Sequence, residues 1–391
     1  MLGATAKLNH SLRNKLTTKM KIISICFTLL TFCLTVCGQP KTKQTDNSVK
    51  FDIIIKHFKE RNYSQDTIRL PLIHQDKDYK IVISDNPIAF DLKETVLKNP
   101  IDSKYPISFS IVYQNKLVSL FEPGTFVCYS IPTLSRDTEF EEKLNTKKFQ
   151  YHWLLDNKLV GLSDGKYYYL NSDNIWLDYT VSVPFTSQPK LFEDSNYISF
   201  CDCQGEWGGT VYFYNKTTKK IYFTEATCAN SILKKGNEYL VLSHLGHMMG
   251  TTELKAIANP DKLSLVDLKN TNKTFKGQAL GYAENSKGAK IIFNYDDIQI
   301  FASFTYQGKT IYLVYWKDET FLAEIKNNAI QIVNPLFNRE LYTHHPVTTN
   351  YDNTILMNLD FYGIAKEREV SCIIIKDNQL IKLDWNEKHS R

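Results

Sequence analysis

The chain has 391 residues, which is enough for one large domain or for two to three ordinary ones. Apolar residues make up 43% and charged residues 23%, a composition that excludes a wholly disordered chain, collagen, a coiled coil and a polytopic membrane protein. The aromatic content of 13% favours a strand-rich protein, because aromatic rings suit the half-buried surface of a sheet.

An export signal is predicted at the amino terminus. Met20-Lys21 precedes the uncharged run Ile22–Val36, which would rise only about 22 Å as a helix. That is too short to span a hydrocarbon core of about 30 Å comfortably. A basic start followed by a short apolar run is typical of a secretory signal, so we expect translation to start at Met20 and residues 1–36 to be a signal segment.

The end of this run, Leu34-Thr-Val-Cys37, resembles the lipobox of bacterial lipoproteins. Leu34 and Cys37 match that pattern, whereas Val36 stands where the family usually has a small residue. The resemblance covers residues 20–40 and implies lipidation of Cys37, a membrane anchor and a place in the cell envelope. Residues 37–50 are then a polar tether. Ordinary secretion with cleavage near Gln39, or a core helix, are the alternatives.

Removal of the signal segment changes the charge of the chain. Residues 1–36 carry five basic residues and no acidic one, so the remainder has 42 Lys and Arg against 42 Asp and Glu. Without a basic excess, no electrostatic term holds phosphates, and nucleic acid is excluded as a partner. The expected partners are the membrane, through the lipid, and a protein or glycan ligand.

A short helix or edge element is predicted over residues 51–65. Phe51, Ile54, Ile55 and Phe58 recur at helical spacing, with charged residues on the other faces. An edge strand through the same apolar residues is the alternative.

From residue 66 to residue 386 the chain repeats a short apolar or aromatic strand, a polar turn and another strand. Asn-Lys, Asp-Asn and Asn-Asn at the turns predict hairpins, because these residues tolerate positive φ. The clearest copies are residues 166–177, 211–223, 321–333 and 372–383. Residues 387–391 are a tail.

A more apolar strand precedes several of these hairpins, at intervals of about 40 to 45 residues. Such strands begin near Leu159, Tyr197, Tyr239, Ile311 and Thr354. The period resembles that of β-propeller blades, although no named blade signature is present. We therefore predict an all-β propeller of about seven four-stranded blades over residues 66–386. Eight blades, or a pair of β-sandwiches, are the alternatives.

A cluster of Cys and His residues is the strongest candidate for chemistry. Cys201 and Cys203 lie one blade before His244 and His247, and matching positions of adjacent blades come close together. These four are candidate ligands for zinc or copper. A disulfide from Cys203, or from Cys201, to Cys228 is an alternative for an exported protein, and buried free thiols are another. Cys128 and Cys372 fall within predicted strands and are expected to be core thiols.

The same segment suggests a ligand site. A Trp beside a carboxylate is typical of sugar or cation recognition, since the ring stacks and the acid accepts hydrogen bonds. The candidate ligand-binding residues are Asp202, Glu206, Trp207, His244 and His247. A tryptophan packed between blades, with Gly208-Gly209 allowing strands to approach, is the alternative.

The function predicted from the sequence is that of a lipid-anchored envelope protein whose propeller binds a ligand or partner at one face. No catalytic residue and no cofactor is assigned. Two rivals stay open. One is a carbohydrate-active hydrolase or lyase using acids such as Asp202, Glu206 and Glu225. The other is a metal-binding protein built on the Cys and His cluster.

Overall fold

In the computed structural model the chain divides into two compact units, residues 1–47 and 48–391. The residues described below belong to the second unit and are 51–52, 54–56, 70–85, 90–98, 106–181, 183–247, 250–266, 286–317, 319–336, 343–359 and 372–384. The predicted signal, Cys37, the tether and the tail lie outside them. Within these ranges, no helix combines the length and the apolar character needed to cross a bilayer.

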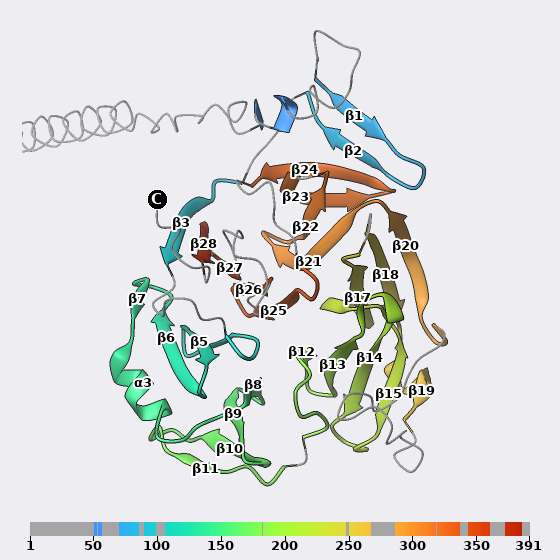
Figure 1. The fold of residues 1–391 in the computed structure, drawn as a ribbon. Helices are drawn as coiled ribbons and strands as arrows, with labels where there is room; N and C mark the ends of the chain where they lie inside the picture. The colour runs from blue at the N-terminus through green and yellow to red at the C-terminus, as the bar shows by residue number, and fades with distance from the viewer. Residues whose placement is uncertain are drawn as a thin grey trace, which may run out of the picture. The chain divides into compact units, whose positions relative to one another are not determined.

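Six antiparallel sheets of four strands form the blades of a β-propeller, arranged around a common centre (Figure 1). Each blade follows the last in sequence, and its first strand is the innermost. Blade 1 consists of β4 (Ile111–Tyr113), β5 (Lys116–Phe121), β6 (Thr125–Ser130) and β7 (Ser135–Arg136). Blade 2 consists of β8 (Tyr151–Leu155), β9 (Lys158–Ser163), β10 (Lys166–Leu170) and β11 (Trp176–Asp178). Blade 3 consists of β12 (Lys190–Glu193), β13 (Tyr197–Cys203), β14 (Gly209–Asn215) and β15 (Ile221–Glu225).

Blades 4 to 6 complete the ring. Blade 4 consists of β16 (Ala229–Lys235), β17 (Glu238–Leu245), β18 (Thr251–Ile257) and β20 (Lys290–Asp296). Blade 5 consists of β21 (Gln299–Tyr306), β22 (Lys309–Trp316), β23 (Glu319–Lys326) and β24 (Ala329–Pro335). Blade 6 consists of β25 (Val347–Tyr351), β26 (Thr354–Asn358), β27 (Cys372–Lys376) and β28 (Gln379–Asp384). The short strand β19 (Ser264–Leu265) adds to the outer edge of blade 3.

The prediction of a propeller is confirmed, but the prediction of about seven blades is wrong. The four hairpins recognised in the sequence are the third and fourth strands of blades 2, 3, 5 and 6, and the apolar strands before them are second strands. The error came from dividing residues 66–386 evenly. Residues 72–98 contribute extra strands to other blades, and the third and fourth strands of blade 4, β18 and β20, are separated by residues 258–289, longer than any other step within a blade.

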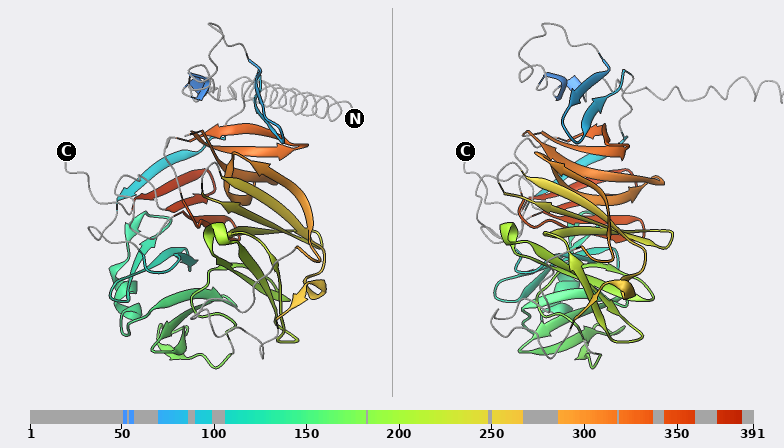
Figure 2. Two further views of the ribbon diagram at one scale, coloured as in Figure 1. Left: turned by 45° about the vertical axis from the view of Figure 1, so that its right-hand side comes forward. Right: turned by 90° about the vertical axis from the view of Figure 1, so that its right-hand side faces the viewer.

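These extra strands lie along the outer edges of the last two blades (Figure 2). β1 (Leu72–Gln75) and β2 (Lys80–Ile83) form a hairpin, and β2 pairs in parallel with β24. β3 (Lys93–Lys98) pairs in parallel with β28 along its full length. The predicted helix is seen at residues 51–52 and 54–56, where Phe51 and Ile54 are buried in the apolar cluster that includes residues of the β1–β2 hairpin and of blade 5. Residues 57–65 lie outside the described part.

Six apolar clusters hold the blades together, one at each junction between neighbours. Successive side chains of a strand point to opposite faces, and in a blade both faces meet another blade. In β27, Ile373 and Ile375 therefore pack toward blade 5, while Cys372 and Ile374 pack toward blade 1. This double burial explains why the strands read as unbroken apolar runs and why aromatic residues are so abundant.

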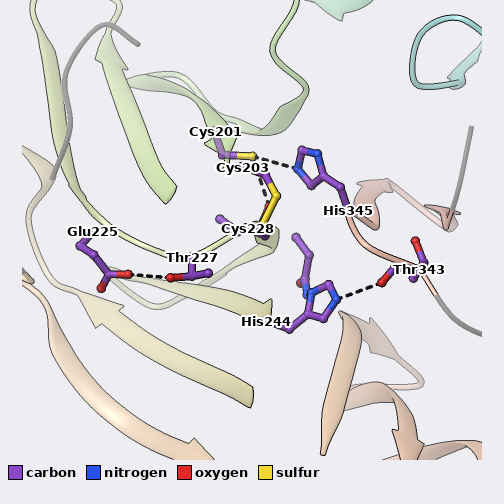
Figure 3. Close-up of a disulfide and its surroundings, with 10 residues drawn as sticks. Cys201, Cys203, Glu225, Thr227, Cys228, His244, Thr343 and His345 are labelled. Carbon is purple, nitrogen blue, oxygen red and sulfur yellow. Dashed lines mark hydrogen bonds between the residues drawn. A yellow bond between two sulfur atoms is a disulfide. The ribbon is translucent and has the colours of Figure 1, made fainter. Parts of the chain in front are cut away.

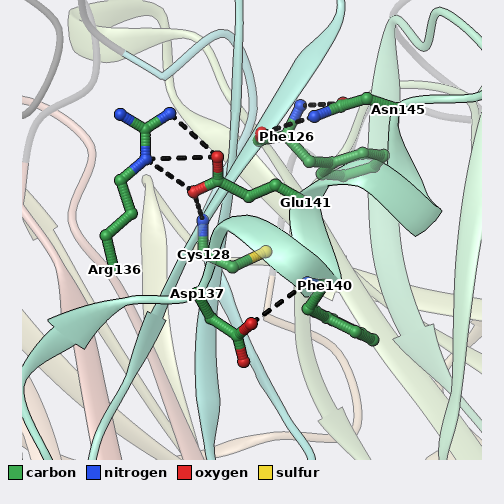
Figure 4. Close-up of polar contacts among 7 residues, drawn as sticks. All are labelled: Phe126, Cys128, Arg136, Asp137, Phe140, Glu141 and Asn145. Atoms are coloured by element: carbon green, nitrogen blue, oxygen red, sulfur yellow. Dashed lines mark hydrogen bonds and ion pairs between the residues drawn. The ribbon is translucent and has the colours of Figure 1, made fainter.

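Blade 1 differs from the others because a helix completes its outer edge (Figure 4). β7 has only two residues, and α3 (Thr138–Leu144) covers the rest of β6. Glu141 accepts a hydrogen bond from the Cys128 backbone N–H at 2.9 Å. Asn145 accepts one from the Phe126 N–H at 2.7 Å and donates to the Phe126 carbonyl at 2.9 Å. Glu141 and Asn145, one helical turn apart, thus make the hydrogen bonds to the backbone of β6 that a neighbouring strand would otherwise make.

Candidate binding cavity at one end of the ring

Two cavities open at the centre of the ring, one at each end of the innermost strands. The first, which we call the entry cavity, has a volume of about 180 Å³ and is lined by segments that lead into β4, β8, β12 and β25, and by the end of β13. Its lining residues are Ser108, Phe109, Tyr151, Ser187, Gln188, Pro189, Cys201, Asp202, Cys203, Gln204 and His345. The second, the turn cavity, measures about 1010 Å³ and is lined by the hairpins that follow the inner strands.

The ion pairs at the turn cavity balance one another. Lys216 lies 2.7 Å from both Asp156 and Glu193, and Glu193 also pairs with Lys190 at 2.7 Å. Lys234 pairs with Asp194 at 2.6 Å, so three lysines face three carboxylates. Because these charges come from blades 2, 3 and 4, the network joins neighbouring blades, and we assign it a structural role.

Asp202 is the central residue of the entry cavity. It lies near the end of β13, is 9% exposed, and accepts a hydrogen bond from the Tyr212 hydroxyl at 3.0 Å. The Gln188 side chain also hydrogen-bonds to it. Burial raises the pKa of Asp202 to about 6, against the lowering effect of these two hydrogen bonds.

Gln188 is held in place before β12. Its Oε1 accepts from the backbone N–H groups of Thr186 and Ser187, at 3.0 and 3.2 Å, and its carbonyl accepts from the Trp153 indole at 2.9 Å. With Oε1 occupied by two donors, the amide nitrogen is the group left to face Asp202. The carboxylate therefore has a fixed orientation at the wall of the cavity.

A disulfide borders the same cavity (Figure 3). It joins Cys203, at the end of β13, to Cys228, just before β16, and so links blade 3 to blade 4 across 25 residues. This is one of the pairings expected from the sequence. Cys201 stays a thiol, donates to the Ala229 carbonyl at 3.2 Å and lies 3.6 Å from Nε2 of His345. Burial raises its pKa well above the ordinary value.

The four predicted metal ligands do not form a site. Cys203 is bound in the disulfide, and His244 is 1% exposed with Nε2 facing the Thr343 carbonyl at 3.3 Å (Figure 3). His247 lies at the surface, 3.3 Å from Glu206. Across the described ranges, no three His, Cys, Asp or Glu residues converge to hold a metal ion. This disulfide-bonded arrangement therefore gives no support to the zinc or copper interpretation.

Trp207 is exposed rather than packed between blades. It ends the short 3-10 helix η1 (Gly205–Trp207), which follows Gln204 of the entry cavity, and 73% of its surface is accessible. The expected close approach is found instead at Gly209. A Cβ there would lie 2.7 to 2.8 Å from backbone atoms of Ala226, Cys228 and Asp202, so only glycine fits.

The three acids considered for a hydrolase each have different partners and do not share one site. Glu206 faces His247, and Glu225 pairs with Lys255 and accepts from Thr227 at 3.2 Å. Asp202 is the one that lines the entry cavity. Of the predicted ligand residues, the structure therefore places Asp202 at the cavity, Glu206 and Trp207 on the adjoining η1, His244 in the interior and His247 opposite Glu206.

Gln188, Tyr212 and His345 belong to this site and were missed from the sequence. They come from segments far apart in the chain, and no spacing connects them. Gln188 and His345 share one weak signal, since each is followed by a proline and then by the inner strand of a blade.

The chain matches no protein-family model and no curated protein. Solved structures resemble it weakly. The designed protein Ika8 is 11% identical over 72% of this chain and 74% of its own, with a TM-score of 0.30. BamB from Moraxella catarrhalis is 10% identical over 72% and 70%, with a TM-score of 0.31. The N-terminal domain of Nup159 is 8% identical over 75% and 86%, with a TM-score of 0.33. The propeller assignment rests on the sheet topology.

Proposed function

We propose that this protein is a lipid-anchored binding protein of the cell envelope, whose propeller holds a partner at the end of the ring that carries the entry cavity. The anchor is proposed from the resemblance of Leu34–Cys37 to a lipobox. The binding role is proposed from the surface around η1 and from the cavity beside it. Loops at the ends of a propeller lie on a rigid scaffold, which is where binding residues usually occur.

The exposure of Trp207 is the observation that carries this proposal. The other three described tryptophans, Trp153, Trp176 and Trp316, are 4 to 6% exposed, whereas Trp207 is 73% exposed. Leaving a large aromatic side chain in water forgoes the favourable burial that the others gain. Tryptophan is also enriched at the centres of protein interfaces, where its ring is covered by the partner.

The surroundings of Trp207 suit an interface centre. η1 begins one residue after Gln204, which lines the entry cavity, and the Gln204 N–H donates to the Gly208 carbonyl at 3.0 Å. The turn is further fixed by Gly209, where the backbone packs too closely for any side chain. A rigid aromatic residue beside a polar cavity offers a partner both a surface to cover and a recess to enter.

Site-specific photocrosslinking in the producing cells tests the binding role. A photoreactive phenylalanine analogue placed at Trp207 is expected to give a discrete crosslinked product. The same analogue at Leu177, 42% exposed on the outer strand β11, is the matched control and is expected to give none. Equal crosslinking at both positions, or none at Trp207, would overturn the proposal.

The anchor is tested separately. Intact-mass analysis of the mature protein is expected to find an amino-terminal Cys37 carrying lipid. Cys37→Ser is expected to move the protein out of the membrane fraction while leaving the propeller folded. Recovery of the wild-type protein with Cys37 unmodified within an uncut chain would contradict the lipoprotein assignment and leave the binding proposal standing.

A further inference from the structure

The strongest unexplained feature of the entry cavity is a buried acid without a counter-charge. Among the described residues, no Lys or Arg lines the cavity, and Asp202 is the one lining residue that is charged at neutral pH. This differs from the turn cavity, where each carboxylate of the network has a lysine within 2.7 Å. Buried carboxylates are normally paired or neutralised, because removing a charge from water is costly.

We infer that the entry cavity binds a protonated amine or guanidinium group, which would form an ion pair with Asp202. The inference rests on the proposed function and names the chemical class recognised at that site. A cation supplied by the ligand would complete the pairing that the protein itself leaves open.

The walls of the cavity fit such a group. Phe109 and Tyr151 place aromatic rings at the lining, and a cation near a ring face is attracted by the ring's quadrupole. Ser108, Ser187 and Gln204 contribute hydroxyl and amide acceptors for the remaining N–H groups. The Tyr212 and Gln188 hydrogen bonds hold the carboxylate in one orientation, so little ordering is needed when the cation arrives.

Nothing else on these walls repels a cation. The other titratable groups facing the cavity are Tyr151, Cys201 and His345. A phenol carries no positive charge in any form. Burial raises the pKa of the Cys201 thiol, which is neutral at pH 7, and lowers the pKa of His345 to about 4, so the imidazole is neutral as well. The net charge of the lining is therefore that of Asp202 alone.

The size of the cavity limits the ligand. About 180 Å³ corresponds to roughly six water molecules at ~30 Å³ each. A primary ammonium on a short alkyl stem fills this space, as does the end of a lysine or arginine side chain. The natural source is therefore either a small free amine or a basic side chain of a partner.

The test is titration calorimetry with n-butylammonium, with n-butanol as the neutral probe of similar shape. We expect n-butylammonium to bind, n-butanol not to bind, and Asp202→Asn to weaken binding by at least about tenfold. Binding by Asp202→Asn as tight as by the wild type, equal binding of the two probes, or no binding of n-butylammonium to the wild type would overturn the inference.

A second pair of variants keeps the test independent of how Asp202→Asn folds. Ser187→Trp, at the entry cavity, is expected to abolish n-butylammonium binding, whereas Ser195→Trp, at the turn cavity, is expected to leave it unchanged. Loss of binding in Ser195→Trp, or retention in Ser187→Trp, would place the amine elsewhere and contradict the inference.

Binding of N-acetyl-lysine methylamide, measured in the same way, distinguishes a basic side chain of a partner from a small free amine. If it binds at least as tightly as n-butylammonium, a partner side chain is the occupant; if it is excluded, the occupant is a small free amine. The outcomes also distinguish this inference from the proposed function. A discrete crosslink at position 207 with no n-butylammonium binding would support the proposed partner surface and contradict the inferred cation site.

Discussion

Ser110 and Asn358 exchange two hydrogen bonds across the junction between the first and the last blade. The Ser110 N–H donates to Asn358 Oδ1 at 2.9 Å, and Asn358 Nδ2 donates to the Ser110 carbonyl at 3.1 Å. The two residues are 2% and 5% exposed, and no strand of blade 1 is shared with blade 6. One side chain therefore acts as a backbone-like link where the ring closes.

Asn358→Ala is expected to destabilise the protein by about 2 to 3 kcal/mol. It leaves the Ser110 N–H and carbonyl buried without their partner, and an unpaired buried polar group costs about 1 to 3 kcal/mol. Urea unfolding measures the change. Asn350→Ala, at an exposed position of the same blade, is the control and should alter stability by less than about 0.5 kcal/mol. Equal effects of both substitutions would show that Asn358 has no special role in closure.

Glu141→Ala is expected to destabilise blade 1 by about 2 kcal/mol. The carboxylate accepts from Cys128 and forms a two-pronged pair with Arg136, at 2.8 Å to each nitrogen, so its removal strips the edge of β6 of an acceptor. Glu142→Ala is the matched control, since Glu142 is exposed on the same helix. Denaturant unfolding compares them, and a control as damaging as Glu141→Ala would mean that α3 stabilises the blade through helix propensity alone.

Reduction of the Cys203–Cys228 disulfide is expected to lower the free energy of unfolding by about 2 to 4 kcal/mol, because the cross-link restricts a loop of 25 residues in the unfolded chain. Thermal melts with and without a dithiol reductant measure this. The variant with both Cys203→Ala and Cys228→Ala should melt at one temperature in both conditions. If complete reduction of the disulfide leaves the melting temperature of the wild-type protein unchanged, the prediction is wrong.

Acid is expected to destabilise the protein between pH 7 and pH 5. Burial lowers the pKa of His152 and of His345 to about 4 and that of His244 to about 3, so the stability that depends on their neutral rings is complete above pH 6.5 and is lost as the pH falls toward those values. At pH 5 each unfolded histidine has gained about 2 kcal/mol from protonation. Asp202, with a raised pKa of about 6, acts in the opposite direction and recovers about 1 kcal/mol.

The three histidines therefore prevail, and we expect a net loss of about 5 kcal/mol at pH 5, measured by urea unfolding at the two pH values. His152→Gln can keep bonds to Ser108 and the Val118 carbonyl without titrating, so it should show a smaller pH dependence than the wild type. Unchanged or greater stability at pH 5 would refute the assignment of neutral buried rings.

Much of the architecture can be predicted from the sequence because both faces of each blade are buried. Apolar runs such as Cys372–Ile375 and polar turns such as Asp156-Asn157 mark strands and hairpins directly, and both turn residues have positive φ, as expected for two-residue hairpins. The number of blades is not accessible in the same way. Strands β1 to β3 have ordinary strand composition, and only their pairing partners show that they extend existing sheets.

The candidate site was predictable only in part. Cys203, Asp202 and Trp207 come from one short segment with unusual composition, which the sequence displays. Gln188 reaches Asp202 from the segment before β12, the neighbouring strand of the same blade, whereas His345 comes to the cavity from the segment before the last blade. A single sequence contains no trace of either proximity. The choice between an exposed and a buried Trp207 stayed open for a related reason, because composition cannot tell whether an aromatic residue points into a junction or away from it.

The parallel pairing of β3 with β28 has a consequence for the order of assembly. A ribosome releases residues 93–98 long before residues 379–384, their only ladder partners among the described strands. During that interval, the leading strand has an open edge that any other chain could pair with. We therefore expect β3 to become ordered only after β28 has been made, and a carboxy-terminal truncation that removes β28 to leave β3 without its ladder partner.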